Sequence, residues 1–66
     1  MRTLESIACD VVRHKGGWFS QEGKTFKFSS VESAVEYNYR MLVVGYKTLA
    51  SPSQGTVEVC NKEQLR

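Results

Sequence analysis

A segment with the pattern of a capped amphipathic helix, at about residues 30–44, limits the fold more than any other part of this sequence. Ser29 is a suitable N-cap, and Glu32 follows three residues later, which is the spacing of a capping box. On a helical wheel six side chains share one side, and we expect that side to face the core. These are Val31, Ala34, Val35, Asn38, Tyr39 and Leu42. Glu36 and Arg40 lie opposite, one turn apart in the favourable order.

The end of this helix is set by Gly45. Gly45 follows two β-branched valines, which are poor helix formers, and glycine suits the position just past a helix end. We therefore expect the helix to end near Val44, with a continuation to Ala50 as the alternative. The remaining segments are then a strand over residues 46–50, a loop over 51–55 and a last strand over 56–60.

The first third of the chain is typical of strands separated by glycine turns. Gly16-Gly17 and Glu22-Gly23 suit tight turns, because glycine adopts a positive φ easily. We expect a three-stranded antiparallel meander made of residues 7–13, 18–21 and 24–28, the last of which alternates strictly. A helix over residues 4–12 is the alternative, because Leu4, Ala8, Val11 and Val12 recur at near-helical spacing.

Together these elements predict a single domain of the α+β class. A chain of 66 residues buries only about 60% of the surface that it exposes when unfolded, which leaves room for one core. We expect a small antiparallel sheet, formed by the N-terminal meander and a C-terminal strand or hairpin, packed on one helix at about residues 30–44. Residues 61–66 are polar and are expected to fray.

Strand pairing predicts which side chains share a face of the sheet. With Glu22-Gly23 as a two-residue loop, Phe19 pairs with Phe26, and the helix is expected to cover the face that carries the phenylalanines. The opposite face then holds a tryptophan among cations, a composition typical of a binding surface. Its members are Arg13, Trp18 and Lys27, with Lys15 and Lys24 at the rim. Arg13 belongs to it only if the first loop has two or four residues. The alternative for the whole face is that Trp18 packs under the C-terminal segment and the basic residues are ordinary solvated charges.

Charge and cysteine content set weaker limits. The net charge is +2, and the excess lies in residues 1–28, with five cations against three anions, a mild indication of an anionic partner. Cys9 and Cys60 are too few for a disulfide framework, so we expect two reduced thiols, or one bridge if their strands are neighbours. No apolar run has the length of a signal peptide core or a membrane span, and we expect a cytoplasmic protein that makes no membrane contact.

Groups that could perform catalysis are sparse. His14 is the only histidine, and the adjacent cations Arg13 and Lys15 disfavour an imidazolium, so we expect a solvated turn residue. No spacing of His and Cys indicates zinc, and no glycine-rich phosphate-binding motif is present. We therefore expect a protein that is not an enzyme and that needs no cofactor and no metal.

The stretch from residue 15 to residue 42 resembles two kinds of small module. One is the three-strand-plus-helix DNA-binding domain of plant ethylene-response factors and of integrase arm-binding domains. The matching positions are Trp18, Phe28, Ser30, Glu32 and Ala34. This resemblance implies a sheet in the major groove, with Arg13, Lys15, Trp18 and Lys27 on the DNA. The other is a group of short bacterial proteins with a similar GGW…F-x-S/T-x-E-x-A pattern.

The sequence thus favours a non-enzymatic small binding protein. We expect a regulator or inhibitor, of a kind that phages and mobile elements encode, which binds another protein through the sheet face around Trp18 or through a strand edge. A homodimer built on one of these surfaces belongs to the same prediction. The alternative is a nucleic-acid-binding module that uses Arg13, Lys15, Trp18 and Lys27, whose affinity would fall steeply with salt.

Overall fold

In the computed structural model, which describes residues 3–62, the chain begins with helix α1 (Leu4–Lys15). The Thr3 hydroxyl caps this helix by accepting a hydrogen bond from the Ser6 N–H at 3.0 Å. Glu5 in the first turn and basic residues in the last turn complement the helix dipole. The helix buries three side chains: Ile7, Ala8 and Val11.

The strand predicted over residues 7–13 is therefore wrong, and the helical alternative is correct. A strand would have placed Asp10 on the same face as Ala8 and Val12, because side chains alternate along a strand. A helix instead gathers the apolar residues on one side, and Asp10 lies off that side. Residues 3–62 consequently contain two α-helices where one was predicted.

The first two strands form a hairpin, β1 (Phe19–Glu22) and β2 (Thr25–Phe28). Its two-residue turn is Gly23-Lys24, one residue later than predicted. Gly23 has a φ of 64°, as expected for a type II′ turn, which prefers glycine in the first central position. Phe19 consequently pairs with Phe28 instead of Phe26. Because this shift in register is two residues, the phenylalanines still share one face, as predicted.

The second helix, α2 (Val31–Val43), follows at once, and its bounds agree with the prediction to within one residue. The N-cap is Ser30, whose hydroxyl accepts from the Ser33 N–H at 3.1 Å, and not Ser29 as predicted. Gly45, at φ 99°, follows the end of the helix.

The C-terminal part is a second hairpin, β3 (Tyr46–Ser51) and β4 (Thr56–Lys62), joined by the short helix η1 (Pro52–Gln54). The strand order is β1-β2-β4-β3, all antiparallel, so β4 lies inside the sheet, and β1 and β3 form its edges. The α+β class is confirmed. Asn61 and Lys62 are the last residues of β4, and residues 63–66, the rest of the tail that was expected to fray, lie outside the described part of the chain.

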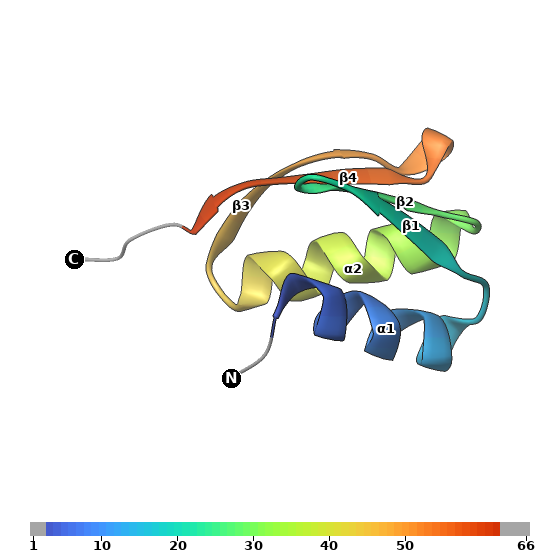
Figure 1. Cartoon of the computed structure of the whole chain (residues 1–66). Helices are drawn as coiled ribbons and strands as arrows, with labels where there is room; N and C mark the ends of the chain where they lie inside the picture. Colours follow the sequence, from blue (N-terminus) through green and yellow to red (C-terminus); the bar gives the residue numbers. More distant parts are fainter. Residues whose placement is uncertain (1–2, 63–66) are drawn as a thin grey trace.

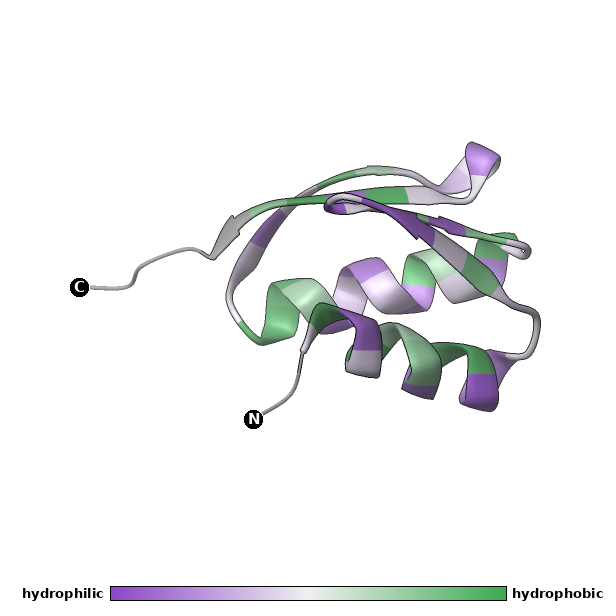
Figure 2. Ribbon diagram, in the orientation of Figure 1, coloured by the Kyte–Doolittle hydropathy of each residue, from purple (hydrophilic) through white to green (hydrophobic). Residues whose placement is uncertain are grey.

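Both helices cover one face of the sheet and leave the other face open (Figure 1). Apolar and polar residues alternate in bands along the helices, as expected where one side of each faces the sheet (Figure 2). The core centres on Tyr37 of α2, whose ring lies 5.0 Å from that of Phe26 and 5.1 Å from that of Phe28. Valines of β4, Met41 and the apolar side of α1 complete it.

The predicted core side of α2 is largely wrong. The buried side chains of α2 are Ser33, Ala34, Tyr37 and Met41, and only Ala34 belongs to the predicted stripe. The reason is α1, which the sequence reading had placed in the sheet. Since α2 packs against both the sheet and α1, its buried side is rotated towards α1. The Ser33 hydroxyl donates to the Gly16 carbonyl at 2.8 Å, and the Tyr37 hydroxyl donates to the Leu4 carbonyl at 3.3 Å.

Candidate functional site

The five residues predicted to form one binding face lie on three different parts of the fold. Arg13 and Lys15 are in the last turn of α1, Lys24 is in the β1–β2 turn, and Lys27 is on the open face of the sheet. All five side chains are exposed. Arg13 cannot belong to the sheet face because α1 is a helix, so that part of the prediction is wrong.

Trp18 is held by its backbone and leaves its side chain in solvent. Its N–H donates to the Ser29 hydroxyl at 2.8 Å, and its carbonyl accepts from the Ser29 N–H at 2.8 Å, which extends the β1–β2 hairpin by one pair. The indole is 66% exposed. Alternation places Trp18 on the open side of the sheet together with Lys27, as the sequence predicts. A Cβ at the preceding Gly17 would collide with the Ser29 hydroxyl, so the close contact between the backbone at Gly17 and Ser29 requires glycine.

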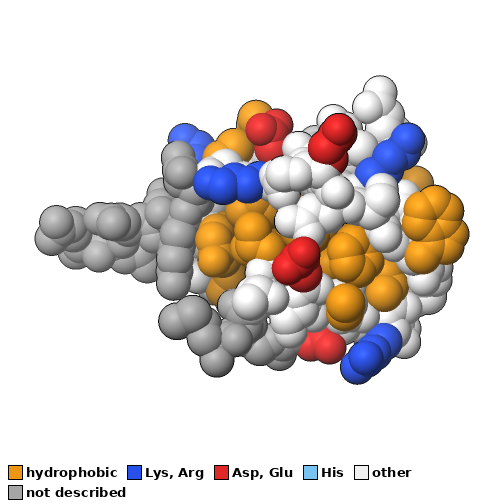
Figure 3. All heavy atoms as spheres, viewed as in Figure 1, with side chains coloured by type: hydrophobic (Ala, Val, Ile, Leu, Met, Phe, Trp, Pro, Cys, Tyr) orange, Lys and Arg blue, Asp and Glu red, His pale blue; other side chains and the backbone are white. Residues whose placement is uncertain are grey.

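Charged side chains are dispersed on the surface. On the side shown in Figure 3, Lys and Arg alternate with Asp and Glu, and apolar atoms are visible between the sheet and α1. On α2, Arg40 donates to the Glu36 carboxylate at 2.8 Å, as the i,i+4 pattern predicts. This hydrogen bond is the main reason that the pKa of Glu36 lies below its ordinary value.

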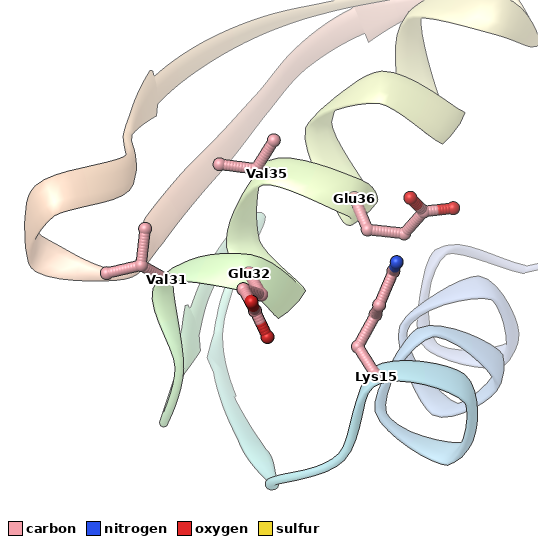
Figure 4. A pocket seen from close by; sticks show the side chains of 5 residues that line it. All are labelled: Lys15, Val31, Glu32, Val35 and Glu36. Atoms are coloured by element: carbon pink, nitrogen blue, oxygen red, sulfur yellow. The ribbon is translucent and has the colours of Figure 1, made fainter.

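A shallow hollow of about 300 Å³ lies between the end of α1 and the first turns of α2. Its lining residues are Lys15, Val31, Glu32, Val35 and Glu36. The Lys15 side chain points towards Glu36 across this hollow, and the two valines lie on the side away from Lys15 (Figure 4). Lys15 also helps to lower the pKa of Glu36. The hollow thus combines one lysine and two glutamates with two exposed aliphatic side chains.

Half of the eight exposed large apolar side chains in the described residues form a row along α2. The row consists of Val31, Val35, Tyr39 and Leu42, and the four residues are 50%, 49%, 63% and 53% exposed. The sequence pattern predicts this stripe but assigns it to the core. The pattern identifies which residues share one side of α2, but it does not show whether that side faces the core or the solvent. Four half-exposed apolar side chains on one side of a helix are more than the single exposed residues usual on a protein surface.

The α2 row continues to the free edge of the sheet. Asn38 lies on the same side of α2 as Val31 and Leu42, and its Oδ1 accepts a hydrogen bond from the Thr48 hydroxyl of β3. This bond places the row beside β3, the edge strand. Leu49, the next residue of β3, is 63% exposed on the open face of the sheet, where its neighbour across β4 is Glu58. We call the α2 row together with β3 the α2–β3 surface.

Within residues 3–62, no three His, Cys, Asp or Glu side chains are grouped closely enough to hold a metal ion. Cys9 and Cys60 are both free, which agrees with the expectation of reduced thiols. None of the helices in this part of the chain has the length and apolar character needed to cross a membrane.

The fold therefore defines a small two-layer α+β domain with one bare sheet face and one apolar helix surface beside a free strand edge. Comparisons with models of protein families, with curated proteins and with solved structures find no significant match to this chain. The resemblance to the ethylene-response-factor and integrase modules thus stays a prediction.

Proposed function

We propose that this protein acts by binding another protein chain through the α2–β3 surface. The observation that carries the proposal is the α2 row: four large apolar side chains, each about half exposed or more, lie beside an edge strand. An apolar row next to a free strand edge suits a partner that adds a strand to β3 and packs side chains on α2. The strand edge was one of the two surfaces that the sequence predicted for protein binding.

Binding of this kind lets a small protein regulate or inhibit a larger one without chemistry of its own. The partner would bury the α2 row, and removing this apolar surface from water stabilises a complex by roughly 25 cal/mol per Å². The competing surface is the sheet face around Trp18, which offers one exposed aromatic ring and mostly polar neighbours. The α2–β3 surface offers more apolar area, and we therefore rank it first.

The test compares two substitutions that introduce the same charge at exposed apolar positions. Leu42→Glu changes the α2–β3 surface, and Trp18→Glu changes the sheet face; both side chains are exposed, so both variants should fold. Tagged wild type and variants are used to capture bound chains, and light scattering measures self-association in parallel. We expect Leu42→Glu to reduce binding at least about tenfold and Trp18→Glu to leave it within about twofold. The reverse result would overturn the proposal in favour of the Trp18 face.

Nucleic-acid binding is the alternative outcome of the same test. It predicts a mobility shift with random DNA or RNA that weakens steeply with salt and is lost when Arg13, Lys15 and Lys27 are changed to Glu. These cations lie on α1 and β2, away from Leu42. A salt-sensitive shift that survives Leu42→Glu and is lost in the triple variant would replace protein binding with this function.

A further inference from the structure

We propose that the chain forms a homodimer in which the β3 strands of two copies pair antiparallel about a two-fold axis at Leu49. This inference rests on the proposed function and names the partner of the α2–β3 surface as a second copy of this chain. Four observations support it: the backbone groups at the open edge, the position of Leu49, the placement of α2 and the charge of the surface.

The direction of the backbone groups of β4 follows from its bonds to β2. The Gly55 carbonyl accepts from the Phe28 N–H at 2.6 Å, and the Val59 N–H donates to the Lys24 carbonyl at 2.9 Å. Odd-numbered residues at this end of the hairpin therefore direct their backbone groups to β2. In an antiparallel sheet the direction alternates with each residue, so the even-numbered residues of β4 direct theirs to β3.

The same alternation identifies the free groups of β3. The register of β3 against β4 shifts between Lys47 and Thr48, and after this shift the residues of β3 opposite even-numbered positions of β4 are Leu49 and Ser51. Leu49 and Ser51 use their N–H and C=O groups within the sheet. Thr48 and Ala50 must then direct theirs to the open edge. No backbone hydrogen bond from another described segment reaches this edge. The centre of β3 thus offers two N–H and two C=O groups to an added strand.

A two-fold axis at Leu49 satisfies all four groups. Thr48 of one copy lies opposite Ala50 of the other, and each of these two pairs exchanges two hydrogen bonds. Leu49 then faces Leu49 of the second copy in a non-hydrogen-bonded pair, in which Cα atoms approach to about 4.5 Å. The pairing covers Leu49, the only aliphatic side chain of the described strands that is exposed on the open face.

The placement of α2 fits this arrangement. α2 packs against β3 and β4, so its axis is about one strand spacing, ~4.8 Å, from a two-fold axis that lies just outside β3. Two copies of α2 would then lie about 10 Å apart, near the usual 8–10 Å distance of packed helices. The α2 rows would face each other across this gap, and the two sheets would join into one with both pairs of helices on the same face.

Charge and area also agree with a second copy. The α2 row carries no charge, and Lys47 is the only charged residue of β3. With Leu49 at the axis, Lys47 pairs with Ser51, and the two Lys47 residues are about 14 Å apart, beyond a Debye length of about 8–10 Å. The row and Leu49 would bury on the order of 300 Å² of apolar surface per chain, against roughly 450 Å² of apolar surface in a standard interface. This area predicts a small interface whose dissociation is measurable.

The test places like and opposite charges at the axis. The variants are Leu49→Lys, Leu49→Glu and the control Ser20→Lys, which adds the same charge to the exposed open face at the other edge of the sheet. Sedimentation velocity should give wild type and Ser20→Lys a concentration-dependent mass that approaches twice the 7.5 kDa of the chain. Either Leu49 variant alone should weaken the dimer at least about tenfold, and an equimolar mixture of the two should restore it. Amide exchange at Thr48 and Ala50 should slow with concentration in wild type and in Ser20→Lys, and in neither Leu49 variant alone.

Three outcomes would overturn the inference. These are a wild-type chain that stays monomeric at all concentrations, a dimer that Leu49→Lys leaves intact, and a mixture of the Lys and Glu variants that behaves as the average of its parts. A monomer whose binding to another protein is lost in Leu42→Glu would overturn the homodimer and leave the proposed function standing. Binding that Leu42→Glu leaves unchanged would overturn both.

Discussion

Three serines around the start of α2 stabilise separate parts of the fold. The Ser30 hydroxyl caps the helix, the Ser29 hydroxyl accepts from the Trp18 N–H, and the buried Ser33 hydroxyl donates to the Gly16 carbonyl. The sequence Ser29-Ser30 presents two candidate caps, and the hairpin decides between them. Because Ser29 pairs with Trp18 at the end of β2, Ser30 is left as the first residue that can cap.

Ser30→Ala should destabilise the protein by about 1 kcal/mol, because it removes the hydroxyl that accepts from the Ser33 N–H at the N-terminus of α2. Ser29→Ala should have a smaller effect, since its bond to Trp18 is exposed to solvent. Urea unfolding of both variants under the same conditions measures the difference. A larger loss of stability in Ser29→Ala than in Ser30→Ala would contradict this assignment of the cap.

The connections of the two β-hairpins each contain a glycine, and the two positions differ in how much space they leave for a side chain. Gly23 in the β1–β2 turn and Gly55 before β4 both have a left-handed backbone, at φ 64° and 73°. A Cβ at Gly23 would meet open space, whereas a Cβ at Gly55 would lie 2.5 Å from the Phe28 carbonyl oxygen. Gly55 is this close because β4 enters the sheet beside the end of β2, where the Gly55 carbonyl accepts from the Phe28 N–H.

Gly23→Ala should therefore destabilise the fold by about 1–2 kcal/mol, the cost of a left-handed alanine. Gly55→Ala should cost roughly 1–3 kcal/mol more, because the β2–β4 contact must also shift. Asparagine separates the two causes, since it tolerates the left-handed backbone but still has a Cβ. Thermal unfolding should show recovery for Gly23→Asn and none for Gly55→Asn. Equal recovery at both positions would show that the contact with Phe28 does not matter.

At the scale of the whole molecule, Tyr37 joins the two layers. Its ring packs on Phe26 and Phe28 of the sheet, and its hydroxyl donates to the Leu4 carbonyl of α1. Burial is the main reason that the pKa of Tyr37 lies well above its ordinary value, and the nearby Tyr46 raises it further. The folded protein therefore keeps this phenol protonated under alkaline conditions in which the unfolded chain releases the proton.

Stability should consequently fall as the pH rises above about 10, where an unperturbed tyrosine ionises. In that range the unfolded state binds fewer protons than the folded state, so the free energy of unfolding decreases with pH. Below about pH 9 the contribution of Tyr37 is fully present. Tyr37→Phe lacks the titrating group, and its deficit relative to wild type should shrink between about pH 9 and pH 11.5. Urea unfolding over this range measures it, and a constant difference would contradict the assignment.

Local patterns in the sequence are enough to place α2, the phenylalanine strands and the end of the helix at Gly45. Caps, strict alternation and positive-φ glycines act within a few residues, so their effect can be read along the chain. The same local patterns do not decide whether residues 4–12 form a strand or a helix. Both conformations would bury apolar residues in this segment. Which one forms depends on the elements against which the segment packs in the folded protein.

The partner also decides which side of α2 is buried. Two apolar sides compete on α2, and the sequence alone favours the side with Val31, Val35 and Leu42. Packing of α1 beside α2 selects the side with Tyr37 and Met41 instead, because that side meets both α1 and the sheet. The position of β4 between β2 and β3 likewise depends on pairing between segments that are distant in the sequence, and it leaves β3 at the edge of the sheet. Contacts between distant segments therefore created the α2–β3 surface, and no local pattern contains them.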